Sequence, residues 1–269
     1  NLLDPGKTPA ENIQFLVFLM SVIKAVDEYA DLLRISVASA GNDHRLGANE
    51  APPAVVSIFL GDELTEVLKS IENDTYFTSH GAVQMDIGAT VLPHFVKDNT
   101  DRNRTSPFAF TGNKFEFRML GSAASVANPN IVLNTAVAEA LDQFAKELDG
   151  VAPEDMEHAV HELIKRAIKK HKRVIFNGNG YTDEWIEEAE KRGLYNLKST
   201  PDALPMWIAQ KNIDLFTKHS IFTSEELHSR YEIWLENYSK TINIESNTMV
   251  EMVQKDLLPS VMSYIEEIA

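Results

Sequence analysis

The sequence predicts an α+β protein, with a short antiparallel sheet in its first half and mostly helices in its second half. Charged and aromatic residues alternate over residues 114–118, which is the period-two pattern of a strand with one buried face. Capping signals and helical periodicity dominate after residue 148. The chain has 269 residues, of which 44% are hydrophobic, so it can bury a substantial core. We predict a mixed domain over residues 1–150 and a helical domain over residues 151–269.

The first predicted element is a helix over residues 9–33. It opens with Thr8-Pro9-Ala10-Glu11, a capping box with proline at the first helical position. Its later residues are apolar on nearly every side, so we expect the helix to be buried on more than one face. Residues 35–39 alternate like a strand. Residues 41–53 are polar and end in two prolines, which predicts an irregular loop of the kind that often carries binding residues.

An apolar run over residues 55–60 precedes a second helix, predicted over residues 62–71 because its apolar residues recur at helical spacing. Further along, Thr111-Gly112-Asn113 has the composition of a tight turn. This turn predicts a hairpin in which residues 108–110 pair with the charged strand at 114–118.

The rest of the chain is predicted to be helical, apart from a short strand over residues 173–176. Helices over residues 130–148 and 153–170 are separated by Gly150, since glycine commonly ends helices. Three more starts or breaks are expected: a helix capped by Thr182 and stopped by Gly193, a helix opened by the capping box Thr223-Ser224-Glu225-Glu226, and a kink at Pro259 in the last helix, which runs to Ile268.

The composition excludes several classes of protein. The net charge is −15, from 40 acidic and 25 basic residues, which argues against a surface for nucleic acids or anionic membranes. No apolar run reaches the roughly 18 residues that a membrane span needs. The absence of cysteine excludes disulfides and fits a cytoplasmic protein. Because the chain begins without methionine and enters a helix almost at once, we expect it to be a piece of a longer polypeptide.

The hairpin gathers charges around one tight turn. In a strand, Lys114, Glu116 and Arg118 share one face and the phenylalanines occupy the other. A carboxylate between two cations is costly on a half-buried sheet unless something else binds there. Two explanations remain open. Either the charges form ion pairs on a solvated face, or the arginines, including Arg102 and Arg104 of the preceding loop, bind a phosphate or carboxylate while Glu116 ligates Mg²⁺.

Arg45 and Glu50 share the polar loop that ends at Pro52-Pro53. The prolines stiffen the loop exit and limit the positions that Glu50 can reach. A fixed carboxylate can accept a proton from an amine while a nearby arginine holds a substrate carboxylate. A simple salt bridge within the loop is the competing explanation, and on spacing alone it is favoured.

Two other motifs are weaker. Asn177-Gly178-Asn179-Gly180 lies between a predicted strand and a helix, as phosphate loops do. It lacks the Lys-Ser/Thr ending of a P-loop and the third glycine of a dinucleotide fingerprint, which favours an ordinary turn. His158, His161 and Glu162 lie on neighbouring helical turns without the two-histidine zinc pattern, which favours a solvated helix face.

Taken together and in order, several segments resemble glutamine synthetases. Residues 42–53 resemble the Arg-Leu…Glu-Ala-Pro loop of those enzymes, and the fuller wording resembles their long bacterial type III form. The other matching segments are Arg-Asn-Arg-Thr-Ser at 102–106, Phe-Glu-Phe-Arg at 115–118, Ala-Asn-Pro-Asn at 127–130 and Phe-Asn-Gly-Asn-Gly-Tyr at 176–181.

The resemblance implies part of a catalytic domain with a curved antiparallel sheet and packed helices, followed by a helical extension. It implies ATP-dependent ligation of ammonia to glutamate through γ-glutamyl phosphate, and therefore a role in glutamine biosynthesis and nitrogen metabolism. The implied roles are these: Arg45 binds the glutamate carboxylate, Glu50 takes the proton from ammonium, Arg104 contacts the ATP phosphates, Glu116 ligates Mg²⁺ or Mn²⁺, and Arg118 grips the transferring phosphoryl group or the γ-carboxylate.

Departures from the family pattern limit what the chain can do alone. The distance from Pro53 to Arg102 is longer than in compact forms of the enzyme, which implies an insertion beside the site. A second arginine of those forms has no counterpart, because phenylalanines occupy the region of residues 108–110. The glycine-rich stretch with its histidine and the earlier metal-binding glutamates are missing. We therefore expect this chain to be the C-terminal part of the enzyme and to be inactive by itself.

Two other functions remain open from the sequence. One is a related carboxylate–amine ligase that uses a different amine. The other is a non-catalytic helical interaction module whose hairpin charges are only solvated. The family assembles as rings with active sites shared between subunits, so the resemblance implies a homo-oligomer for the full-length enzyme.

Overall fold

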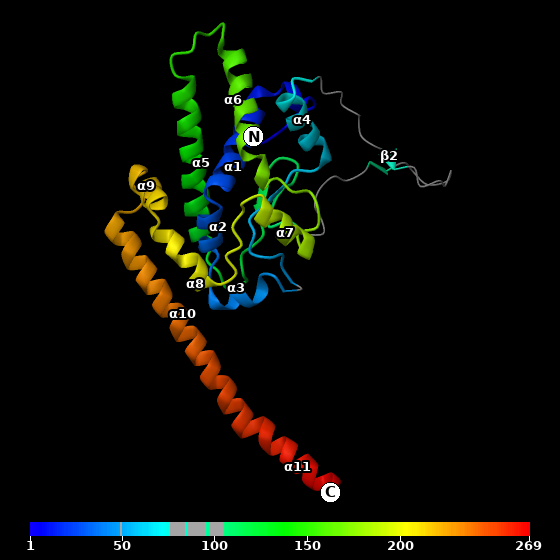
Figure 1. Cartoon of the computed structure of the whole chain (residues 1–269), viewed down its shortest axis with the longest axis vertical. Coiled ribbons are helices and arrows are strands. Elements are labelled where there is room, and N and C mark those ends of the chain that lie inside the picture. The colour runs from blue at the N-terminus through cyan, green and yellow to red at the C-terminus, as the bar shows by residue number, and fades with distance from the viewer. Residues whose placement is uncertain (49, 76–83, 86–94, 97–104) are drawn as a thin grey trace.

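The computed structural model describes residues 1–48, 50–75, 84–85, 95–96 and 105–269. It confirms an α+β fold in which helices form most of the body and a small sheet lies beside them (Figure 1). Helix α1 (Ile13–Glu28) packs against α5 (Ala127–Leu148) and α6 (Met156–His171), and α2 (Ala30–Ser36) also contacts α5. The core of the molecule therefore forms around α1.

The apolar residues of α1 explain its central position. Leu19, Ile23 and Val26 are fully buried, as expected for a helix that is apolar on several sides. Its N-terminus differs from the prediction. The predicted capping residue, Thr8, precedes only a short 3₁₀ turn (Pro9–Glu11) and makes no side-chain cap, whereas the Asn12 side chain accepts a hydrogen bond from the Phe15 amide.

Two predictions for residues 35–53 are wrong. The expected strand at 35–39 is absent: Ile35 and Ser36 end α2, and Val37 lies in a turn. Ile35 and Val37 are buried, and this tertiary packing outweighs their strand propensity. The expected loop starting at residue 41 begins with a short helix, α3 (Ala40–Arg45). Ser39 caps that helix by accepting a hydrogen bond from the Asn42 amide, and the two prolines lie too far along the chain to prevent it.

The sheet contains the predicted hairpin. Strands β4 (Phe108–Phe110) and β5 (Phe115–Phe117) pair antiparallel, and Gly112 in their turn has φ +92°. Strand β1 (Ile58–Phe59) adds to β4 in parallel, so this sheet is mixed rather than purely antiparallel. Phe108 is fully buried, and its ring lies 5.1 Å from that of Phe115. A second pair, β2 (Gln84–Met85) and β3 (Phe95–Val96), is antiparallel.

Most of the predicted helices are present. Helix α4 (Asp62–Glu72) matches its prediction, whereas α5 begins three residues before and α6 three residues after its predicted start. Thr182 caps α7 (Asp183–Lys191) by accepting from the Trp185 amide. The expected strand at 173–176 is only partly present. A 3₁₀ turn (Lys172–Val174) occupies its first half, and Ile175 makes a single parallel bridge to Ile58.

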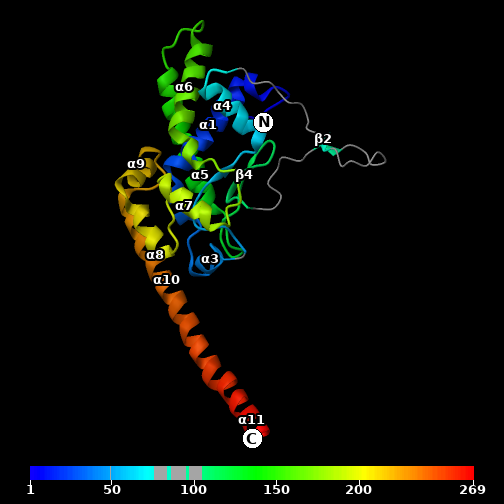
Figure 2. The same ribbon diagram turned by 45° about the vertical axis from the view of Figure 1, so that its right-hand side comes forward.

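The C-terminal helices follow α8 (Thr200–Ala203), a 3₁₀ turn (Leu204–Ile208) and α9 (Gln210–Lys218). Helix α10 (Ser224–Met252) opens with the predicted capping box, packs against the body near Trp207 and then extends away from it (Figures 1 and 2). A π turn (Val253–Leu257) joins it to α11 (Leu258–Ile268), so the break predicted at Pro259 takes the form of this turn.

The domain boundary at residue 150 stays a prediction. Helix α6 lies beyond that boundary, yet it packs along α1 and α4 from the first half of the chain. The elements that carry the predicted site residues are α3 and the loop after it, together with the β4–β5 hairpin.

Candidate functional site

The charged face of β5 exists as the alternation predicts. The Glu116 carboxylate accepts a hydrogen bond from Arg118 Nη2 at 3.1 Å, and Lys114 Nζ lies 3.5 Å from its other oxygen. The Arg118 side chain is only 14% exposed, whereas that of Glu116 is 41% exposed. The guanidinium is therefore held near the body of the protein, and the carboxylate faces outward beside it.

These contacts keep Glu116 ionised. The hydrogen bond from Arg118 lowers the pKa of the Glu116 carboxyl below its ordinary value, and Lys114 acts in the same direction. Thr111 Oγ1 also donates to this carboxylate, at 3.4 Å. A carboxylate beside a guanidinium can offer oxygen atoms to a cation while the guanidinium binds an anion.

Arg45 and Glu50 form the loop salt bridge that was the simpler explanation for them. Arg45 Nε lies 3.5 Å from Glu50 Oε1. Arg45 also extends to the hairpin, because its Nη1 donates to the Met119 carbonyl oxygen at 3.3 Å. Since Met119 follows Arg118 directly, the loop with Arg45 and Glu50 lies beside the end of β5.

Asn42 fixes this arrangement from within the core. It is buried, and its Nδ2 donates to the carbonyl oxygens of Val37 and Met119 at 2.7 and 2.9 Å. Gly121 approaches the same side chain so closely that a Cβ there would lie 3.3 Å from Asn42 Oδ1. The motif at residues 42–53 thus contributes a buried asparagine that joins α3 to the end of the hairpin.

The segment Asn177–Tyr181 is interpreted from the sequence as an ordinary turn. It bridges the two site loops, namely the loop after α3 that carries Glu50 and the segment before β4 that contains Thr105. The Gly180 amide donates to the Thr105 carbonyl oxygen at 3.1 Å, and the Tyr181 hydroxyl donates to the Glu50 carbonyl oxygen at 3.3 Å. At the other end, Asn177 Oδ1 accepts from the Leu60 and Gly61 amides. The glycines at 178 and 180 are the sequence feature that could have predicted this bridge, because close approach of another segment to the backbone favours glycine.

Arg104, predicted to contact phosphates, lies outside the described residues, as does Arg102. Thr105, the next residue along the chain, is described and contacts Gly180. Among the predicted site residues that the structure describes, Arg45 contacts the backbone that follows Arg118, and Glu50 pairs with Arg45.

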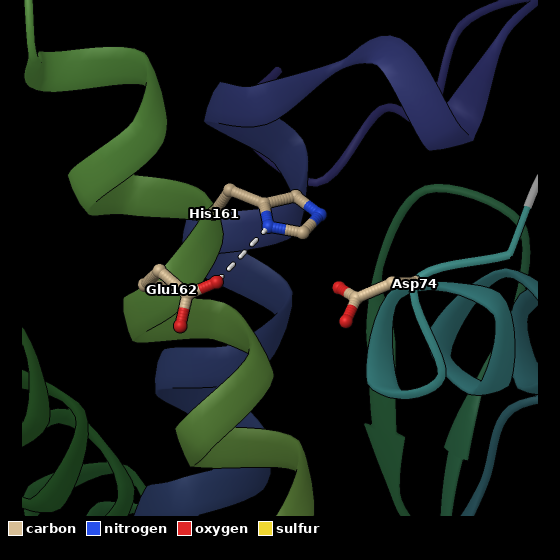
Figure 3. A group of neighbouring side chains, drawn as sticks. All are labelled: Asp74, His161 and Glu162. Atoms are coloured by element: carbon tan, nitrogen blue, oxygen red, sulfur yellow. Dashed lines mark ion pairs between the residues drawn. The ribbon is translucent and has the colours of Figure 1, made fainter.

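Among the described residues, one group of histidine and acidic side chains could hold a metal ion, namely Asp74, His161 and Glu162 (Figure 3). Their ligand atoms lie within 4.8 Å of one another. Asp74 is already paired with the Lys165 ammonium, and all three side chains are well exposed to solvent. This group fits the solvated helix face that the sequence predicts. Glu116 does not belong to it, so β5 offers one carboxylate to a metal.

Comparison with known proteins identifies the family of the chain. Residues 159–269 match the model of the glutamine synthetase C-terminal domain. Along its full length the chain is 57% identical to a glutamine synthetase of Butyrivibrio fibrisolvens, covering 100% of this chain and 38% of that protein. It is 50% identical to a type-3 glutamine synthetase of Dictyostelium discoideum, covering 100% of this chain and 37% of that protein.

A glutamine synthetase of Bacteroides fragilis (strain YCH46) is 40% identical over 98% of this chain and 37% of its own length. The chain belongs to the glutamine synthetase family and corresponds to a C-terminal part of its members, as the sequence resemblance indicated. It spans less than two-fifths of the length of these relatives. None of the helices described here combines the length and apolar character of a membrane span.

Proposed function

We propose that this chain supplies one side of the active site of a glutamine synthetase, which ligates ammonia to glutamate with ATP through γ-glutamyl phosphate. The observation that carries this proposal is the placement of Glu116 and Arg118 on one strand face, next to the loop that holds Arg45 and Glu50. Family membership supports the same reaction.

The cationic groups suit the anionic substrates. The phosphoryl group moves from ATP to the γ-carboxylate of glutamate, and negative charge spreads over its oxygens in the transition state. Arg118, shielded from solvent and aligned by Glu116, would stabilise that charge. Arg45 would bind the glutamate carboxylate, and Arg104 would contact the ATP phosphates.

Glu50 would act on the second substrate. Ammonia attacks the activated carbonyl only after ammonium has lost a proton, and a nearby carboxylate can accept that proton. The Glu50 side chain is 78% exposed and is therefore accessible to an incoming ammonium ion. Its backbone is held from behind by the Tyr181 hydroxyl.

A divalent metal, Mg²⁺ or Mn²⁺, completes the proposed site. When bound, it neutralises phosphate oxygens during the transfer. Glu116 could offer an ionised oxygen ligand to it, because Arg118 keeps this carboxyl deprotonated. One carboxylate does not make a metal site, so the remaining ligands would come from parts of the protein outside this chain. We therefore propose that the chain alone is inactive and acts within a homo-oligomer of the full-length enzyme.

Substitution of Glu116 tests the proposal. In the full-length enzyme, Glu116→Gln should lower glutamine formation by about 10²-fold, because the charge that would face the metal is lost. It should also raise the Mg²⁺ concentration needed for half-maximal rate. The matched control is Glu236→Gln on the exposed face of α10. Unchanged activity and metal dependence in Glu116→Gln would favour a non-catalytic role, and turnover with a polyamine but not with ammonium would favour a different ligase.

A further inference from the structure

A cavity that none of the predicted site residues lines lies between α4 and the C-terminal ends of α6 and α7. Its volume is about 550 Å³, which is in the range of small-molecule sites. Six of its twelve lining residues are cations, in a chain whose net charge is −15. These residues are Lys69, Lys169, Lys170, Lys172, Arg173 and Arg192.

The lining contains one carboxylate, that of Glu72, which pairs with Lys172 at 2.6 Å. The Lys69 and Lys169 ammonium groups form no ion pair with any carboxylate in the described part of the chain. They are exposed and line the same cavity. Lys69 and Lys169 thus add two cations without an ion pair among the described residues. The other four cations of the lining are paired: Lys170 with Glu28, Lys172 with Glu72, Arg173 with Asp27 and Arg192 with Glu188.

The arginines of the wall are held in place by the fold. Arg173 Nε donates to the buried Asp27 carboxylate at 2.7 Å. Arg192 Nη1 donates to the Ile175 carbonyl oxygen at 2.9 Å, and its guanidinium lies over the Trp185 ring. Preorganised donors of this kind lose little conformational entropy when they bind an anion.

Helix dipoles explain only part of this charge. Lys69, Lys169 and Lys170 lie in the last turns of α4 and α6, where cations are favourable. Lys172 and Arg192 are the C-cap residues of α6 and α7, where the same effect applies. It does not account for Arg173, and it does not explain why these helix ends converge on one cavity. The remaining wall is partly apolar, with Leu68, Ile168 and Ile175.

We propose that this cavity binds a small organic phosphate, whose phosphate groups contact the lysines and whose carbon skeleton lies on the apolar wall. The volume of about 550 Å³ suits a small anion, and the net negative charge of the chain disfavours extended polyanions. A short segment of the chain also links this cavity to the proposed active site. Asn177 lines the cavity and begins the segment that reaches Glu50 through Tyr181.

Lysine acetylation in the presence of inorganic pyrophosphate tests this site locally. In the full-length protein, pyrophosphate at about ten times its apparent dissociation constant should slow acetylation of Lys69 and Lys169 by about tenfold. Peptide mass spectrometry measures the rate at each lysine. Lys146 and Lys240 serve as internal controls, because they are exposed and lie on α5 and α10.

Pyrophosphate should also slow acetylation of Lys172, which lines the same cavity. The double variant Lys69→Gln/Lys169→Gln should lose this protection of Lys172, whereas Lys240→Gln should retain it. Equal protection of Lys146 and Lys240, or an unchanged Lys172 protection in the double variant, would overturn the proposal. Neither substituted residue belongs to the proposed active site. A loss of local protection can therefore be distinguished from a failure of the proposed function, which Glu116→Gln tests.

Discussion

At the scale of single residues, one charged side chain of the matching motifs, that of Asp43, contacts the core. Asp43, which lies between Asn42 and Arg45 in the sequence motif, accepts a hydrogen bond from Arg34 at 2.9 Å and from the Thr200 amide at 2.6 Å. Arg34 is almost fully buried, so this carboxylate neutralises a charge inside the core. One motif thus combines core anchors, Asn42 and Asp43, with the exposed pair Arg45 and Glu50.

Gly180 provides a test of the bridge between the two site loops. A Cβ at this position would lie 2.4 Å from the Thr105 carbonyl oxygen. The backbone must move to relieve this clash. Gly180→Ala should therefore displace the loop that leads to Arg104. Displacements near 1 Å can cost about 10²-fold in rate, so we expect a loss of that order in glutamine formation by the full-length enzyme.

The control for this substitution is Gly41→Ala in α3, where nothing lies within 4 Å of the added carbon. That variant should keep its activity. Full activity in Gly180→Ala would show that the contact with Thr105 does not position the site.

A cluster around Lys218 predicts how stability depends on pH. Hydrogen bonds from Lys146 and Lys218 lower the pKa of Asp142 from 3.8 to about 2. Burial alone would raise the pKa of Glu139, but hydrogen bonds from Lys218, Gln143 and His219 prevail and lower it. Both carboxyls have lower pKa values in the folded state, so their contribution is complete above the unfolded values and is lost as the pH falls.

The free energy of unfolding should therefore decrease as the pH falls from 4.5 to about 2. Urea titrations across this interval measure the effect. Lys218→Met should make the decrease shallower, whereas Lys240→Met on α10 should not. A curve that is the same in both variants would contradict the assigned cause.

At the scale of elements, local signals located most helices correctly. Thr182 and Thr223 both cap the helices that follow them, and Gly150 and Gly193 adopt positive φ after helix ends. Such signals act within one turn of the backbone and need no distant partner. The error at residues 35–39 arose because a short alternating segment fits both periods, and packing against α5 favoured the helix.

The capping box of α10 allows a quantitative prediction. The Glu226 amide donates to Thr223 Oγ1, and the Thr223 amide donates to the Glu226 carboxylate. Thr223→Ala should lower the free energy of unfolding by about 1 kcal/mol, because a helix-terminal amide loses its partner. Urea unfolding measures this change. Thr241→Ala, in the middle of the same helix, is the control, and an equal effect of both substitutions would argue against the cap.

At the scale of the whole molecule, the C-terminal helices have two distinct parts. Near its start, α10 buries Leu227 and brings Trp234 within 4.7 Å of the Trp207 ring centroid. Beyond that contact the helix leaves the body (Figure 2). Helix α11 exposes large apolar side chains, including Met262 and Ile265. The first part belongs to the folded core and the second does not.

This division predicts unequal effects of charge substitutions along one helical run. Ile265→Glu should change the free energy of unfolding of this chain by less than about 0.5 kcal/mol, because the side chain is already in solvent. Leu227→Glu should unfold or strongly destabilise it, because a buried carboxylate would have no partner. Circular dichroism during urea titration measures both. A large loss of stability in Ile265→Glu would mean that α11 contributes to the core.

The sequence by itself determined the helical second half, the hairpin and the family. Each depends on patterns that act locally or on motifs that keep their order along the chain. Only the tertiary structure showed that Arg45 contacts the end of β5, that Asn177–Tyr181 bridges the site loops, and that lysines from α4 and α6 share a cavity. These features depend on contacts between residues more than seventy positions apart in the sequence. Side-chain spacing along the chain carries no information about such contacts, because the packing of the core decides them.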